Sequence, residues 1–192
     1  MSSVTQFLIE RASEPKLQDP APPAAALDQA FQCAARAPDH ALLRPWRYLV
    51  VQGDDRERLG ELFATTCSDD ATEAEREKAR RSPLRAPVVI VGIASPRHHP
   101  KVPEVEQVMT AAIGLSFVGL SLRDAGFGAM WRTGAVAYHP VVHEGLGLAE
   151  HESIVGFLYA GSVAQQKPAV PRPEPREFVA RWHQPGATSG WE

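Results

Sequence analysis

The chain has 192 residues, 44% of them hydrophobic, which suits one globular domain with a real core better than two domains. Its formal net charge of −3 gives no reason to expect a nucleic acid or an anionic membrane as partner. The N-terminus lacks a basic signal-peptide region, no run of about 18 apolar residues is present, and the two cysteines do not suggest a disulfide framework, so we expect a cytoplasmic protein.

The first half of the chain shows two helical periodicities before its first strand. Apolar residues at helical spacing predict a short helix from Val4 that ends before Arg11, and prolines within residues 14–23 prevent its continuation. The next elements in chain order are a helix over 24–37 closed by Pro38, a strand over 46–51, and an amphipathic helix over 54–63. Cys33 lies on the apolar pattern of the second helix and is expected to be a small buried residue.

The second half begins with a nearly all-polar stretch, residues 69–82, which predicts a solvated helix or a flexible cover. A continuous apolar run then predicts a strand buried on both faces, and the following 22-residue helix is apolar almost all round, as in a core helix or a dimer interface. The elements predicted here are a strand over 88–93, the long helix over 104–125, a strand over 127–132, a short helix over 140–146 and a strand over 154–159.

Strands separated by helices, one of them very apolar, predict an α+β fold: a three-layer sandwich built on a central sheet. We expect residues 1–192 to form a single domain. Residues 163–192 form a proline-rich C-terminal extension, which is unsuited to a core element and more suited to wrapping over a partner or a groove.

Three short stretches carry groups that could bind a polar or flat ligand. Arg11-Ala12-Ser13 follows the first helix, and a guanidinium with a nearby hydroxyl can hold a phosphate. The alternative is that Arg11 interacts with the helix C-terminus and Ser13 is a turn residue. Arg36 and His40 flank the end of the second helix and could hold a ligand across it, unless Asp39 pairs with Arg36 on the surface and His40 is simply solvated.

The third stretch, residues 127–134, has glycines that allow close backbone approach, with Trp131 as an aromatic wall and Arg132 and Thr133 as polar contacts. The alternative is an ordinary strand with a core tryptophan. His139 and His143, four residues apart, could form half of a metal site, but no third ligand is evident and we expect no metal. Motifs for an ATPase, a Rossmann dinucleotide site and a hydrolase nucleophile elbow are absent.

In this order the stretches resemble the nitroreductase family, in particular its short bacterial YdjA-like branch of NAD(P)H nitroreductases. The resemblance covers roughly residues 5 to 180, and its most specific part is the pair RAPDH…PW and GFG…WR[ST]G. The matching stretches are FLIERAS, AARAPDHALLRPW, RAPVVIV, HPKVPEVEQVMTAAIG, GFGAMWRTGA and IVGFLYAG.

The resemblance implies a nitroreductase-like sandwich with a central mixed sheet, an intertwined homodimer, and FMN at the subunit interface. It assigns Arg11, Ala12 and Ser13 to the phosphate and ribityl chain, Arg36 and His40 to the partner subunit's contribution, and NAD(P)H approach to Ser121. Further flavin contacts are implied for Trp131, Arg132, Thr133 and Lys167.

The implied activity is an NAD(P)H oxidoreductase that passes hydride through flavin N5 to nitroaromatic or quinone acceptors by a ping-pong mechanism, with no side chain as indispensable acid or base. Larger relatives have a basic residue four positions after the first arginine, where this chain has Pro15, so Arg36 or Arg132 is the hypothesis for that role. Two alternatives stay open: another flavin-dependent reaction on the same fold, such as dehydrogenation or flavin breakdown, and a non-catalytic flavin-binding protein.

Overall fold

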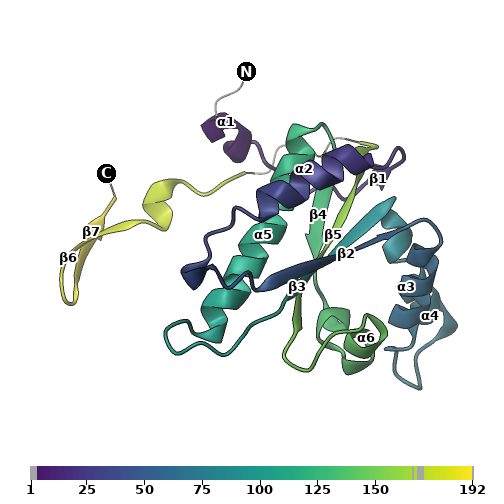
Figure 1. Cartoon of the computed structure of the whole chain (residues 1–192). Helices are drawn as coiled ribbons and strands as arrows, with labels where there is room; N and C mark the ends of the chain where they lie inside the picture. Colours follow the sequence, from purple (N-terminus) through teal and green to yellow (C-terminus); the bar gives the residue numbers. More distant parts are fainter. Residues whose placement is uncertain (1–3, 166, 168–170, 192) are drawn as a thin grey trace. The chain divides into compact units, whose positions relative to one another are not determined.

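The computed structural model describes residues 4–165, 167 and 171–191, and these form two compact units (Figure 1). The larger unit spans residues 13–166 and contains the sheet. The smaller unit combines the N-terminal residues up to Ala12 with the chain from Lys167 onward. The expectation of one domain over residues 1–192 stays a prediction.

The sheet of the larger unit has five strands, and its longest, β5, pairs with three of the others. β5 pairs with β3, β4 and β1, and β2 pairs with the other edge of β3. The strands are β1 (Leu17–Gln18), β2 (Trp46–Gln52), β3 (Val88–Ala94), β4 (Gly128–Arg132) and β5 (Ser153–Val163).

The pairings described within this sheet are antiparallel, so the prediction of a mixed sheet is wrong for these strands. Alternation of strands and helices favours parallel crossovers. Here the helices between β2 and β3 bring the chain back to the end of the sheet that it left, because Gln52 faces Val88 across the ladder. A helical connection can therefore join antiparallel neighbours.

Helices cover both faces of the sheet, which confirms the three-layer α+β sandwich. On one face α2 (Ala24–Ala34) and α5 (Glu104–Asp124) pack against β3 and β5. On the other face lie α3 (Asp55–Ala64) and α6 (Pro140–Gly145), with α4 (Glu73–Arg80) against α3. Two apolar clusters, one on each side, form the core.

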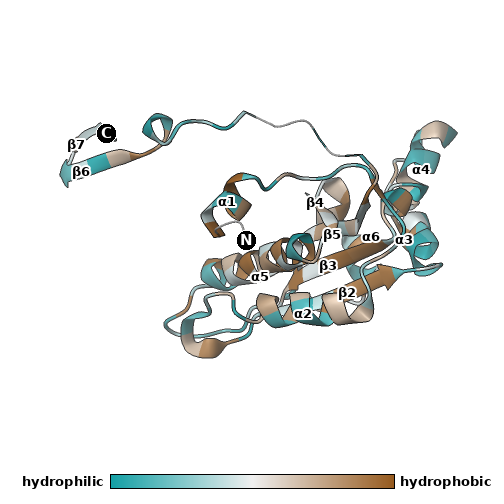
Figure 2. Cartoon of the chain, turned by 90° about the horizontal axis from the view of Figure 1, so that it is seen from above, coloured by the Kyte–Doolittle hydropathy of each residue, from teal (hydrophilic) through white to brown (hydrophobic). Residues whose placement is uncertain are grey.

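Strand β3 shows why the sheet needs both layers. Val88 and Ile90 belong to the cluster under α2 and α5, while Val89 and Val91 belong to the cluster under α3 and α6. Successive side chains of a strand point to opposite faces, so a continuous apolar run is buried only between two layers. Figure 2 shows the apolar colouring of this strand, and its residues are buried throughout, as predicted.

Helix α5 is both a core helix and a partly exposed apolar one. Leu115, Val118 and Leu122 are fully buried against the sheet. Val105, Met109 and Ile113, spaced four apart, leave an apolar stripe exposed on another side. By length and composition α5 is the described helix that could cross a membrane, a property that core helices share; here its buried side packs on α2 and the sheet.

Most predicted elements appear within a few residues of their expected ends. The second helix ends at Ala34, earlier than predicted, because the chain tightens into turns in which Arg36 N–H donates to the Cys33 carbonyl. Cys33 is half-exposed, so its expected burial is wrong. The polar stretch after residue 69 contains α4, whose Thr72 and Glu75 form a capping box.

The smaller unit contains α1 (Val4–Ile9) and a C-terminal hairpin of β6 (Ala180–Gln184) and β7 (Ala187–Gly190). This hairpin lies within the proline-rich extension, for which no strand was predicted. It forms because the prolines cluster before residue 176, whereas Pro185 and Gly186 (φ 78°) occupy the turn itself. Arg172 Nη2 donates to the Arg11 carbonyl at 2.7 Å, which joins the two ends of the chain within this unit.

Candidate functional site

Directly after the predicted phosphate-binding stretch, residues 11–13, the chain lies beside β4. Glu14 N–H donates to the Ala129 carbonyl at 3.0 Å, so Ser13 and Glu14 run beside the strand that carries Trp131 and Arg132. A Cβ on Gly128 would lie only 3.1 Å from the Glu14 Cβ, so the glycine permits this close approach. Glu14 Oε2 is buried and has no hydrogen-bond partner among the described residues. Ser13 is thus placed at β4, about 115 residues away in sequence.

Trp131 lies flat against β5 on the sheet face covered by α2 and α5. It packs on that apolar cluster, and its cross-strand partner is Leu158. A Cβ on Gly156 would fall 2.0 Å from the Trp131 Nε1 atom. The indole therefore occupies the space that any other residue at 156 would fill. Trp131 is only partly buried.

Arg132 points to the opposite face, as strand alternation requires. It is paired across the ladder with Phe157, and its guanidinium lies 5.6 Å from the centroid of the buried Tyr159 ring. Burial raises the pKa of Tyr159, and the positive charges of Arg132 and Arg85 oppose this shift. A ligand at the end of β4 can reach the backbone of Trp131, Arg132 and the exposed Thr133. The Trp131 and Arg132 side chains, however, lie on opposite faces of the sheet.

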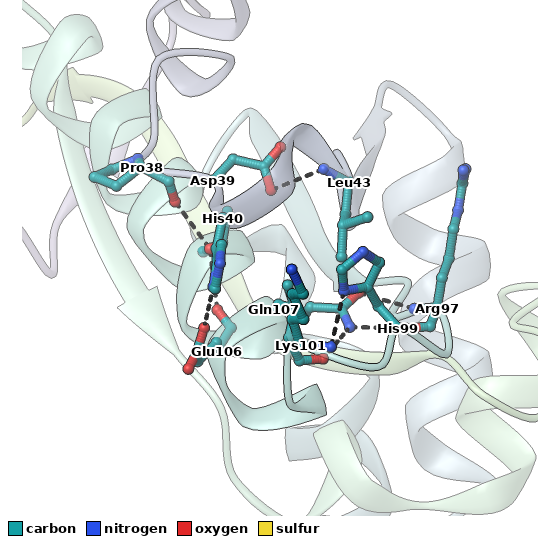
Figure 3. Close-up of polar contacts among 11 residues, drawn as sticks. Pro38, Asp39, His40, Leu43, Arg97, His99, Lys101, Glu106 and Gln107 are labelled. Atoms are coloured by element: carbon teal, nitrogen blue, oxygen red, sulfur yellow. Dashed lines mark hydrogen bonds and ion pairs between the residues drawn. The ribbon is translucent and has the colours of Figure 1, made fainter.

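The loop after α2 is anchored to the first turns of α5 (Figure 3). His40 Nδ1 lies 2.9 Å from Glu106 Oε2, and the Thr110 hydroxyl donates to the Pro38 carbonyl. The Asp39 carboxylate accepts backbone N–H groups of the same loop, and the ion pairs of the described residues do not include Asp39 with Arg36. Arg36 is exposed, and its side chain has no polar partner among the residues that the structure describes.

Within one chain, His40 and Trp131 lie at different levels of α5. Gly119 packs against Leu158, the partner of Trp131, whereas Glu106, the partner of His40, lies 13 residues earlier on the helix. At 1.5 Å per residue, Glu106 and Gly119 are about 20 Å apart along the helix axis. Ser121, half-buried two residues after Gly119, lies at the level of β4.

Three predicted residues belong to the smaller unit. Arg11 and Lys167 are exposed, and Ala12 is half-exposed. Arg11 N–H donates to the Leu8 carbonyl at 3.2 Å, just past the end of α1. Its guanidinium has no polar partner among the described residues, so it stays available to an anion.

The histidines considered for a metal have other roles. His139 Nδ1 accepts the Val141 N–H at the start of α6, and His143 Nε2 lies 2.8 Å from the Ala137 carbonyl. Within the described part of the chain, no group of three or more His, Cys, Asp or Glu side chains is arranged to hold a metal ion.

Sequence reasoning missed a half-buried ion pair at the start of β5, in which Glu152 is buried and the Arg47 side chain is 34% exposed. Arg47 Nε and Nη2 donate to the two oxygens of the Glu152 carboxylate at 2.7 and 2.6 Å, and Ala149 N–H adds a third bond. The Arg47 hydrogen bond lowers the pKa of Glu152 to about 2 against the opposing effect of burial. The partners are 105 residues apart, so no local pattern could have shown them.

A cavity of about 620 Å³ lies beside this ion pair, between the loop after β3 and the start of β5. Gln107 is buried and fixes one wall, since its amide accepts Arg97 N–H and donates to the Arg97 carbonyl (Figure 3). The walls carry both signs of charge, including Arg97, Glu104 and Glu150. None of the residues predicted for the ligand lines it.

The nitroreductase family model matches most of the chain, residues 8–162. In Escherichia coli strain K12, a protein named "Putative NAD(P)H nitroreductase YdjA" is 35% identical over 176 residues, which cover 91% of this chain and 96% of that protein. The family-model match ends within β5 and so excludes the C-terminal hairpin.

Solved structures share the fold. A nitroreductase-like family protein from Bacillus cereus superposes with a TM-score of 0.81 at 24% identity, covering 96% of this chain and 98% of that one. The FMN-dependent nitroreductase NfnB from Mycobacterium smegmatis, solved with NADPH, superposes with a TM-score of 0.72 at 17% identity, covering 94% and 97%. These similarities confirm the predicted sandwich.

Proposed function

The chain belongs to the nitroreductase family, and from this membership we propose that it is an FMN-dependent oxidoreductase that takes electrons from NADH or NADPH. The proposal is carried by one observation on the structure: Ser13, the last residue of the stretch that the resemblance assigns to the flavin phosphate and ribityl chain, lies beside the strand that carries Trp131 and Arg132. The relatives named for FMN and NAD(P)H support it. We place the enzyme in the cytoplasm.

The chemistry of the available groups fits FMN. The guanidinium of Arg11 and the ammonium of Lys167 suit a phosphate, and the hydroxyls of Ser13 and Thr133 suit the ribityl chain. The indole of Trp131, seated on Gly156, offers a flat apolar surface of the kind that a ring system needs. These residues would hold the cofactor without supplying an acid or base.

We propose that the active form is a homodimer in which Arg36 and His40 complete the partner's site. The positions along α5 support this: Glu106, the partner of His40, lies 13 residues before Gly119, which packs against the cross-strand partner of Trp131. The exposed apolar stripe of Val105, Met109 and Ile113 supports it too, since such a surface favours burial against a second copy.

FMN, when bound, supplies the two-electron chemistry between NAD(P)H and the acceptor. The protein's part is to hold the phosphate end through Arg11 and Ser13, to keep the ring in place with Trp131, and to leave one side open near Ser121 for the nicotinamide. A site that admits donor and acceptor in turn suits flat acceptors such as nitroaromatics or quinones, in a ping-pong sequence.

We expect the purified protein to be yellow or to take up FMN on reconstitution, and NADH or NADPH to bleach the bound flavin under anaerobic conditions. Absorption spectra recorded before and after each addition measure both. Turnover of a nitro compound distinguishes a reductase from another flavin enzyme. A protein that stays colourless after reconstitution contradicts the proposal, and a flavin that no nicotinamide reduces contradicts its donor.

We expect Arg36→Ala to lower the two-electron reduction potential of the bound flavin by about 30 mV, equivalent to about 1.4 kcal/mol. Arg36 is exposed and has no polar partner among the described residues, whereas the guanidinium of Arg132 lies over Tyr159. A cation stabilises the negative charge of reduced flavin. Spectroelectrochemistry measures the potential. Arg36→Lys should preserve most of it, Arg58→Ala on α3 is the surface control, and an unchanged potential in Arg36→Ala would transfer the role to Arg132.

A further inference from the structure

The loop between α2 and β2 contains an unusual backbone. Ala41, Leu42 and Arg44 have φ values of 62°, 52° and 51°, in the left-handed region that favours glycine. None of the three is glycine, asparagine or aspartate, so local sequence preference does not explain the conformation. Residues of this kind keep such a conformation only where their surroundings fix it.

The Asp39 carboxylate is the group that fixes it from within the loop. Its Oδ1 accepts the Leu43 N–H at 3.1 Å (Figure 3). Its Oδ2 accepts the Arg44 N–H at 2.8 Å. Both bonds close the chain around the left-handed residues. Because the acceptor is charged, they are stronger than bonds between neutral groups.

Bonds to the rest of the larger unit fix the ends of the loop. The Thr110 hydroxyl holds the Pro38 carbonyl, Glu106 holds His40, and the Pro45 carbonyl accepts Ser95 N–H at 3.0 Å. The loop is therefore seated on α5 at one end and on β3 at the other, and its middle depends on Asp39.

The side chains that this conformation presents do not serve the core. Leu42 is 76% exposed, and the His40 side chain is 56% exposed. Exposure of Leu42 forgoes the free energy that burial of an apolar side chain provides, and its positive φ adds a cost in backbone free energy. The loop conformation thus lowers the stability of the isolated subunit, and this cost is explained if His40 and Leu42 contact a ligand.

We propose that Asp39 is a positioning residue, which holds the loop in the one conformation that presents His40 and Leu42 to the flavin and its electron acceptor. The inference rests on the proposed function, because it needs His40 to face a flavin. Asp39 itself touches no ligand; it acts through the backbone N–H groups of Leu43 and Arg44. If the loop samples the competent conformation for only a fraction of the time, apparent affinity falls by that fraction.

The test compares Asp39→Ala and Asp39→Asn with wild type by FMN titration (flavin fluorescence) and by thermal unfolding of the apoprotein. We expect Asp39→Ala to weaken FMN binding on the order of tenfold. Asp39→Asn keeps one acceptor oxygen and should fall between. Asp54→Ala is the matched control, because Asp54 is an exposed aspartate that makes no capping bond at α3.

A second variant separates positioning from relief of strain. Glycine tolerates positive φ, so Asp39→Ala with Ala41→Gly should recover apoprotein stability. We expect FMN affinity not to recover with it, since a looser loop presents His40 less often. Recovery of both would overturn the proposal and leave Asp39 a purely structural role. Should Asp39→Ala fail to fold, the same comparison with Asp39→Asn decides.

A double-mutant cycle tests whether Asp39 affects FMN binding through His40 and Leu42. In a His40→Ala, Leu42→Ala background, Asp39→Ala should weaken FMN binding much less than in wild type, because the groups that it positions are gone. Full additivity would contradict the proposal. Wild-type protein that binds no FMN contradicts the proposed function itself, whereas wild type that binds FMN as tightly as Asp39→Ala contradicts only the role of Asp39.

Discussion

Arg47→Ala is expected to destabilise the protein by about 2 to 3 kcal/mol, less than the loss of one partner from a fully buried ion pair, because 34% of the Arg47 side chain is exposed to solvent. Glu152 is only 8% exposed, and Arg47 satisfies both of its oxygens. Without the guanidinium the carboxylate keeps the Ala149 N–H as a partner but stays buried with an uncompensated charge. Urea-induced unfolding at pH 7, followed by circular dichroism, measures the loss.

The same variant should change the acid dependence of stability. The pKa of Glu152 is lowered from 4.5 to about 2 in the folded protein. A depressed folded pKa stabilises the fold above the unfolded pKa, and this contribution is lost as the pH falls through the folded value. For wild type we expect the Glu152 contribution, on the order of 3 kcal/mol, to disappear between pH 4.5 and 2. Arg47→Ala should lack this loss.

The surface pair Arg58 with Asp55 provides the comparison. Its side chains are 79% and 60% exposed, so Arg58→Ala should change stability by less than about 1 kcal/mol. Replacing both members of the half-buried pair, Arg47→Met with Glu152→Leu, should cost less than Arg47→Ala alone, because no charge is left stranded. Equal losses in Arg47→Ala and Arg58→Ala would show that the half-buried pair contributes nothing beyond an exposed one.

Gly156→Ala is expected to lower stability by about 1 to 3 kcal/mol and to weaken FMN binding at the same time. The new methyl would lie 2.0 Å from Trp131 Nε1 and 2.6 Å from its Cε2, so the indole must lift off β5. Displacement moves the one aromatic side chain that we assign to the flavin. Tryptophan fluorescence and FMN titration report the two effects separately.

The matched control is Gly119→Ala on α5. Its Cβ would meet Leu158 at 3.6 Å, an ordinary contact, and alanine is the better helix former by about 1 kcal/mol. We expect Gly119→Ala to be neutral or stabilising and to leave FMN binding intact. If Gly156→Ala bound FMN as tightly as this control, Trp131 would have no part in holding the ring.

The elements with strong periodicity could be predicted from sequence, and those that depend on distant partners could not. The continuous apolar run of β3 predicted a buried strand, and the long apolar pattern of α5 predicted a helix; both are present. The two-residue strand β1 exists only because Leu17 pairs with Val163. Strand direction likewise depends on how the chain returns across the sheet, so the antiparallel ladder of β2 and β3 had no local signal.

The candidate site divides in the same way. Residue types in the RAPDH and WRTG stretches predicted a ligand site, which stays a prediction. Strand alternation could have placed Trp131 and Arg132 on opposite faces. The left-handed loop was not predictable, because alanine, leucine and arginine carry no preference for positive φ. Only the hydrogen bonds of Asp39 reveal why it forms.

The joining of the two chain ends in one unit has a consequence for engineering. Arg11, its contact Arg172 and the exposed Lys167 all belong to that unit, while every strand of the five-stranded sheet belongs to the other. A circular permutation that links the ends and reopens the chain in an exposed loop would keep the sheet continuous and turn the terminal segments into an internal insert. In such a permutant, Arg11 and Lys167 would lie in the middle of the chain, and the strands of the sheet would follow one another in a different order of synthesis.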